Sequence, residues 1–201
     1  MNPTALVLLD YFGIAVFAIS GALVAAERRL DFVTFIFFAV VTGVGGGTIR
    51  DLLIGAPVFW VRVNGTLLIC IAAALLVWIG RRQRFAGRAL LWFDAAGMAA
   101  YASYGAAKAL GYGVAPVPAF VMGVLTACAG GIIRDVLAGE PSVLMRRELY
   151  VTPAALSAGL FVALVLARLP LWPAAAIAIA AGFGLRGAAI VRGLSLPGYK
   201  D

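Results

Sequence analysis

Apolar residues fall in seven long runs, and the short stretches between these runs carry most of the charge. A transmembrane helix needs about 20 mainly apolar residues, which is close to the length of each run. The pattern predicts seven membrane-spanning helices, at about residues 4–26, 32–54, 63–80, 90–111, 116–138, 150–168 and 172–193. We therefore expect an all-α integral membrane protein with a single transmembrane domain over residues 1–201.

Composition supports this interpretation. Hydrophobic residues make up 64% of the chain and charged residues 12%, whereas soluble domains average about 45–50% and 25%. The net charge of +7 comes from arginines between the apolar runs, where basic residues set membrane topology and contact anionic lipid. We therefore expect membrane lipids, and not nucleic acid, as partners of these basic residues.

The basic residues also predict an orientation. Seven spans place the two termini on opposite sides of the membrane. One side then carries ten basic residues: Arg28, Arg29, Arg81, Arg82, Arg84, Arg88, Arg146, Arg147, Arg192 and Lys200. The other side carries three: Arg62, Lys108 and Arg168. The positive-inside rule predicts an N-terminus outside and a cytoplasmic C-terminus.

The chain contains an internal repeat. A shift of 84 residues, without gaps, matches residues 10–62 to residues 94–146 at 19 of 53 positions. We assign the first repeat to about residues 4–80 and the second to about residues 90–168, with an unpaired helix at about 172–193. Each repeat has three spans, so the second must cross the membrane in the opposite sense to the first. This predicts the inverted-repeat architecture found in many transporters and channels.

The same motif recurs in both repeats: small residues followed by Arg-Asp. Its members are Gly45, Gly46, Gly47, Thr48, Arg50 and Asp51 in the first repeat, and Gly130, Gly131, Arg134 and Asp135 in the second. Glycine costs about 1 kcal/mol in a helix interior. The glycines indicate either close helix packing or a broken helix lining a polar cavity. Because ionisable residues inside a span usually mark a pathway, we favour the broken helix and an ion path.

Adjacent residues of a helix point about 100° apart, so Arg50 and Asp51 cannot both face one path. One member of each Arg-Asp pair is therefore expected to contact a neighbouring helix. The repeat-related carboxylates Asp10 and Asp94 are plausible partners, and the sequence does not decide between pairings. Ser20 and Tyr104 lie mid-span, either as hydrogen-bonding residues between helices or as path lining. Lys108, near a span end, is expected to extend its ammonium to the membrane surface.

On these residues, the chain resembles the trimeric intracellular cation channel (TRIC) family, in particular its short prokaryotic members. The resemblance covers nearly the whole chain. It implies a homotrimer with one pore in each subunit, lined at the glycines by kinked second and fifth helices, and permeation by K⁺ or Na⁺. It also implies the plasma (inner) membrane of a prokaryote. The second motif reads Ala129-Gly-Gly where the first has three glycines, so its break is expected to be milder.

Two functions stay open at this point. The first is a passive channel for monovalent cations, in which exposed carbonyls replace part of the hydration shell. The second is a transporter of a small solute, such as the amino acid glycine, because inverted repeats serve alternating access equally well. We expect no enzyme, no cofactor and no tightly bound metal. The chain has no histidine, and no nucleophile–base constellation is recognisable.

Overall fold

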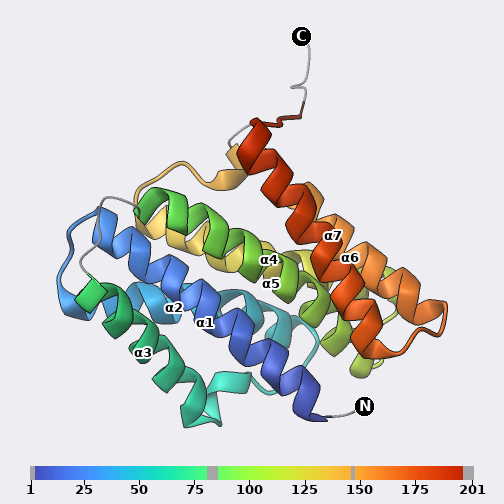
Figure 1. Ribbon diagram of the computed structural model, residues 1–201. Coiled ribbons are helices and arrows are strands. Elements are labelled where there is room, and N and C mark those ends of the chain that lie inside the picture. The colour runs from blue at the N-terminus through green and yellow to red at the C-terminus, as the bar shows by residue number, and fades with distance from the viewer. Residues whose placement is uncertain (1–2, 81–85, 146–147, 197–201) are drawn as a thin grey trace.

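The structure, a computed structural model, describes residues 3–80, 86–145 and 148–196, which form seven α-helices. These are α1 (Pro3–Glu27), α2 (Phe32–Leu53), α3 (Asn64–Gly80), α4 (Ala86–Gly111), α5 (Pro116–Leu137), α6 (Val151–Leu166) and α7 (Leu171–Arg192) (Figure 1). Two short 3₁₀ helices, η1 (Phe59–Val61) and η3 (Val143–Met145), follow α2 and α5. The predicted seven helices are confirmed.

The helices have the length and apolar character of a protein that crosses a membrane several times. Four stretches are long and apolar enough to span: Val7–Glu27, Phe32–Leu53, Pro116–Leu137 and Leu171–Arg192. Helices α3 and α6 are apolar but shorter, with 17 and 16 residues. Helix α4 has 26 residues and carries Arg88, Asp94 and Lys108. The most polar helix of the bundle is therefore also among its longest.

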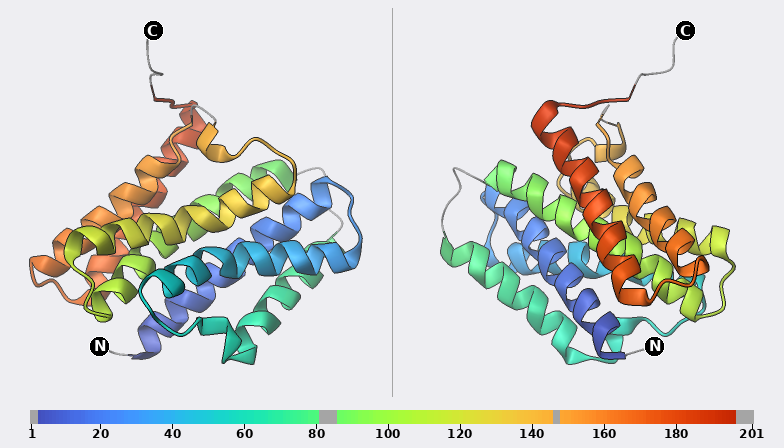
Figure 2. Two further views of the ribbon diagram at one scale, coloured as in Figure 1. Left: turned by 180° about the vertical axis from the view of Figure 1, so that it is seen from behind. Right: turned by 45° about the vertical axis from the view of Figure 1, so that its right-hand side comes forward.

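Helices α1, α2, α4 and α5 form the centre of the bundle. Helix α1 packs along α4, and α2 packs along α5. In Figure 1, α1 and α4 run in opposite directions, and the rear view in Figure 2 shows the same for α2 and α5. Helix α3 packs on α1 and α2, as α6 packs on α4 and α5. Helix α7 packs on α4 and α6, so the extra helix lies on the second half of the chain.

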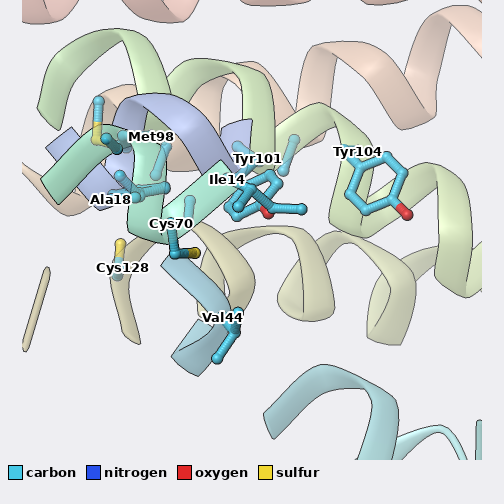
Figure 3. Close-up of a cluster of buried hydrophobic side chains, with 14 of the residues drawn as sticks. Ile14, Ala18, Val44, Cys70, Met98, Tyr101, Tyr104 and Cys128 are labelled. Carbon is cyan, nitrogen blue, oxygen red and sulfur yellow. The ribbon is translucent and has the colours of Figure 1, made fainter. Parts of the chain in front are cut away.

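Small residues let these helices approach closely. The part of the buried core shown in Figure 3 includes the small side chains of Ala18, Cys70 and Cys128, from α1, α3 and α5. The rings of Phe17 and Tyr101, 84 positions apart, meet each other with 5.4 Å between their centroids. Helix–helix packing in membranes relies on such small residues because no hydrophobic driving force acts between helices there. Small side chains thus let the central helices pack closely.

Candidate functional site

The glycine motifs lie where α2 and α5 touch. A Cβ atom on Gly130 would lie 2.5 Å from the carbonyl oxygen of Thr42, and a Cβ on Gly46 would lie well inside 3.0 Å of the carbonyl oxygen of Thr126. Both helices stay α-helical through the motifs. The predicted break is therefore wrong. Inside a membrane, backbone groups freed by a break would need new partners, and these glycines instead allow backbone-to-backbone packing.

A first cluster of charges surrounds Arg50 near the C-terminal end of α2. Arg50 is fully buried, and its Nε donates to the Oδ1 of Asp51 at 2.9 Å. Its guanidinium carbon lies 5.0 Å from the centroid of the Tyr104 ring and 5.9 Å from that of Phe59. Neutralisation by Asp51 and cation–π contacts with the two rings compensate part of the cost of burying the charge.

Lys108 of α4 completes this first cluster. Its Nζ lies 2.8 Å from Oδ1 and 2.9 Å from Oδ2 of Asp51, and 5.6 Å from the centroid of the Phe59 ring. Its side chain is 16% exposed. The expectation that Lys108 extends to the membrane surface is therefore wrong, because a buried carboxylate within reach holds the ammonium inward. One carboxylate, Asp51, thus contacts two cationic side chains.

A second cluster surrounds Arg134 near the C-terminal end of α5. Arg134 is 2% exposed and donates to Asp135 through Nε at 2.9 Å and through Nη2 at 2.8 Å. Its Nη1 donates to Oδ1 of Asp94 at 2.7 Å and to the hydroxyl of Ser20. Here one guanidinium contacts two carboxylates, which is the reverse of the first cluster.

The carboxylates considered as partners behave differently in the two halves. Asp94 contacts Arg134, whereas Asp10 accepts a 3.3 Å hydrogen bond from the Tyr101 hydroxyl. Within the described residues, no ion pair joins Asp10 to Arg50. The sequence left this choice of partners open.

Residues 84 positions apart otherwise make matching contacts. Oδ2 of Asp51 accepts a hydrogen bond from the backbone N–H of Phe59 at 3.1 Å, and Oδ2 of Asp135 accepts one from Val143 at 3.2 Å. Each carboxylate therefore ties the end of its helix to the following 3₁₀ helix. Gly55 and Gly139, at the turns between them, share a positive φ of 68°.

The remaining motif residues have local roles. The Thr48 hydroxyl donates to the carbonyl of Val44 at 2.7 Å and accepts from the indole N–H of Trp60 at 2.9 Å. A Cβ on Gly45 would lie 3.0 Å from the Cδ1 of Ile133. Gly47 faces the Phe59 ring, and Gly131 faces the Tyr150 hydroxyl. A role of these residues along an ion path stays a prediction.

A cavity of about 370 Å³ opens at the end of the bundle where α1 ends and α4 begins. Its lining includes Asp94, Arg134 and Asp135, so the second cluster forms part of its wall. The cavity is also lined by Arg186 of α7, which is 2% exposed, and by Glu148. The Nη2 of Arg186 donates to Oε2 of Glu148 at 3.1 Å.

Lys108 and Phe59 were not predicted as members of the first cluster. The one available signal was that Lys108 occupies a position where the other repeat has Val24. Among the described residues, no group of three His, Cys, Asp or Glu side chains could hold a metal ion. The basic residues Arg81, Arg82, Arg84, Arg146, Arg147 and Lys200, which carry much of the predicted orientation, lie outside the described residues.

Comparison with known proteins identifies relatives over most of the chain. The profile of the family described as glycine transporter matches twice, at residues 7–82 and 91–166. The UPF0126 membrane protein of Vibrio cholerae is 44% identical over 164 residues, covering 80% of this chain and 68% of that protein. The UPF0126 inner membrane protein YadS of Escherichia coli K12 is 43% identical over 147 residues, covering 72% and 71%.

Solved structures give the same assignment. A TRIC trimeric intracellular cation channel orthologue from Rhodobacter sphaeroides is 45% identical, with a TM-score of 0.90 over 95% of this chain and 100% of that one. A second TRIC cation channel is 30% identical, with a TM-score of 0.84 over 96% and 97%. Both similarities extend through all seven helices of the described chain. The chain therefore belongs to the TRIC family of membrane proteins, whose family profile is the one described as glycine transporter.

Proposed function

We propose that this protein is a passive channel for monovalent cations, K⁺ and Na⁺, with one path inside each subunit. The observation that carries the proposal is the pair of buried Arg-Asp clusters, one near the end of α2 and one near the end of α5. Buried charge inside a membrane bundle is costly and usually marks a route for ions. The similarity to TRIC cation channels over nearly the whole chain supports the same function.

The two clusters lie on opposite sides of the glycine contact. We propose that the two halves are inverted repeats, so that the path passes one cluster, then the α2–α5 contact, then the other. Matching contacts of residues 84 positions apart support this, as do the opposite directions of α2 and α5 in Figure 2. The family profile also matches once in each half.

The arginines need not prevent cation flow in this arrangement. Arg134 contacts two carboxylates, whereas Arg50 shares Asp51 with Lys108. These carboxylates reduce the repulsion between the arginines and a passing cation. The narrowest point of the proposed path is the contact between Gly46 and Thr126 and between Gly130 and Thr42, where backbones touch. Conduction then requires α2 and α5 to separate at these glycines.

The similarity to TRIC channels also supports a proposal for the oligomeric state and the membrane location. We propose a homotrimer in the plasma (inner) membrane of a prokaryote, with the N-terminus outside and the C-terminus in the cytoplasm. The ten-to-three distribution of basic residues supports the orientation. In this orientation, the cavity at the end of α1 faces the cytoplasm, and Lys108 lies toward the outside.

Transport of a zwitterion such as glycine is the alternative function, favoured by the description of the matching family. Proteoliposomes separate the two. A channel gives K⁺ efflux down a concentration gradient, at a rate that depends on the applied voltage and not on the glycine concentration. A glycine transporter gives saturable uptake of labelled glycine and little K⁺ flux. We expect K⁺ flux without glycine uptake, and the reverse result would contradict the proposed channel.

A further inference from the structure

The two halves differ at one charged position. Lys108 of α4 contacts both oxygens of Asp51 in the first cluster. The position 84 residues earlier is Val24 of α1, which is 5% exposed and lines the 370 Å³ cavity. A lysine ammonium in one half is thus replaced in the other half by an apolar side chain beside a cavity.

The groups around the Lys108 ammonium have counterparts in the wall of that cavity. The ammonium contacts Asp51 and lies over the Phe59 ring. The corresponding residues, Asp135 and Val143, both line the cavity together with Val24. The location equivalent to the ammonium nitrogen therefore falls in this cavity.

Charge balance makes this location favourable for a cation. The first cluster has two cationic side chains, Arg50 and Lys108, both in contact with Asp51, and the carboxylate equivalent to Asp94 is Asp10, which accepts a hydrogen bond from Tyr101. In the second half, Arg134 alone stands against Asp135 and Asp94, both within 2.8 Å of its nitrogens. Among the described residues, the second cluster thus has the two equivalent carboxylates and one cationic side chain fewer.

Other charges of the cavity do not reverse this balance. Among the residues that the structure describes, its lining holds five carboxylates and four guanidinium groups: Glu27, Asp94, Asp135, Glu140 and Glu148, and Arg28, Arg88, Arg134 and Arg186. Arg186 is paired with Glu148, and Arg28 with Glu140. The described lining residues therefore carry one more carboxylate than guanidinium group.

We propose that this cavity binds one hydrated monovalent cation, K⁺ or Na⁺, beside Asp135 and Asp94, at the location equivalent to that of the Lys108 ammonium. A volume of about 370 Å³ corresponds to about a dozen waters at roughly 30 Å³ each, enough for an ion with its first hydration shell. Its role as the waiting site at one mouth of the path rests on the proposed channel function. Binding itself can be measured without flux.

Thermal unfolding in mild detergent tests the site directly. Wild-type protein is heated in KCl and in N-methyl-D-glucamine chloride at equal ionic strength. At K⁺ ten times above the dissociation constant, the folded state is favoured about 11-fold, so the melting temperature should rise with KCl. Val24→Lys places a tethered ammonium beside Asp135, and Val24→Met is the control of similar length without the charge.

Val24→Lys should already have the raised melting temperature in K⁺-free buffer and gain nothing from KCl, while Val24→Met keeps the KCl-dependent rise. The inference is overturned if wild type shows no rise, if Val24→Lys keeps the wild-type rise, or if Val24→Lys does not fold. Wild-type proteoliposomes provide the separate test of function. Stabilisation by K⁺ without any K⁺ flux would contradict the channel and leave the binding site standing.

Discussion

Replacing Gly46 with alanine adds one methyl group at the backbone contact between α2 and α5. The new Cβ would lie 3.1 Å from the carbonyl carbon of Thr126 and closer still to its oxygen. Because both atoms belong to the backbone, only a movement of the helices relieves the clash. Overpacking costs about 1–3 kcal/mol, and this rigid contact belongs at the upper end. The higher helix propensity of alanine offsets about 1 kcal/mol, leaving a net loss of about 2 kcal/mol in the free energy of unfolding.

Gly45→Ala is the matched control on the same turn of helix. It has the same gain in helix propensity, and its Cβ would meet the flexible end of Ile133 at 3.0 Å and the Cα of Gly130 at an ordinary contact distance of 3.9 Å. In thermal unfolding in detergent, we expect Gly46→Ala to melt about 4–8 °C below wild type and Gly45→Ala to melt no lower than wild type. If the two variants melt at the same temperature, the backbone contact at Gly46 does not constrain the bundle.

The remaining predictions concern charges, assembly and topology. Arg134→Gln leaves two buried carboxylates without their shared partner and should lower the free energy of unfolding by about 3–5 kcal/mol. The control Arg28→Gln, at an exposed ion pair, should lower it by less than about 1 kcal/mol. Chemical unfolding of both variants measures these losses, and equal losses would contradict a stabilising role of the buried cluster. The Thr34 backbone N–H and hydroxyl hold the pKa of Asp31, the N-cap of α2, below its ordinary value. Its stabilising effect is therefore present above the ordinary pKa of aspartate and is lost as the pH falls through the lowered value. The advantage of wild type over Asp31→Ala in melting temperature should shrink in acid, and an advantage independent of pH between 6 and 3 would contradict this assignment. Crosslinking in native membranes should stop at a trimer, and a dimer would contradict the proposed assembly. Reporter tags should place the N-terminus outside and the C-terminus inside, and both ends on one side would contradict the proposed topology.

Hydropathy and the 84-residue shift predicted the helices, because a membrane-spanning helix must be both long and apolar to satisfy its backbone in lipid. The same shift brought Asp94 and Arg134 into consideration together, and the structure joins them at 2.7 Å. These features depend on the position of a residue along a helix, which a sequence records directly.

The structure of the glycine motif and the position of the Lys108 ammonium could not be predicted from the sequence. Three glycines weaken a helix, but whether α2 breaks depends on a close neighbour, and Gly46 has the backbone of Thr126 against it. For Lys108, a flexible side chain near a helix end can reach either the membrane surface or an inward carboxylate. The choice depends on where Asp51 lies across the bundle. The cavity beside Val24 likewise depends on packing between helices that are distant in sequence.

Single-channel recording in planar bilayers with a tenfold KCl gradient tests the central claim most directly. Wild-type protein should give discrete openings that reverse close to the equilibrium potential of K⁺, about 59 mV in magnitude for a tenfold gradient of a monovalent ion, with the sign expected for a cation. Absence of openings from folded, reconstituted protein, or reversal at the potential expected for chloride, would contradict a cation channel.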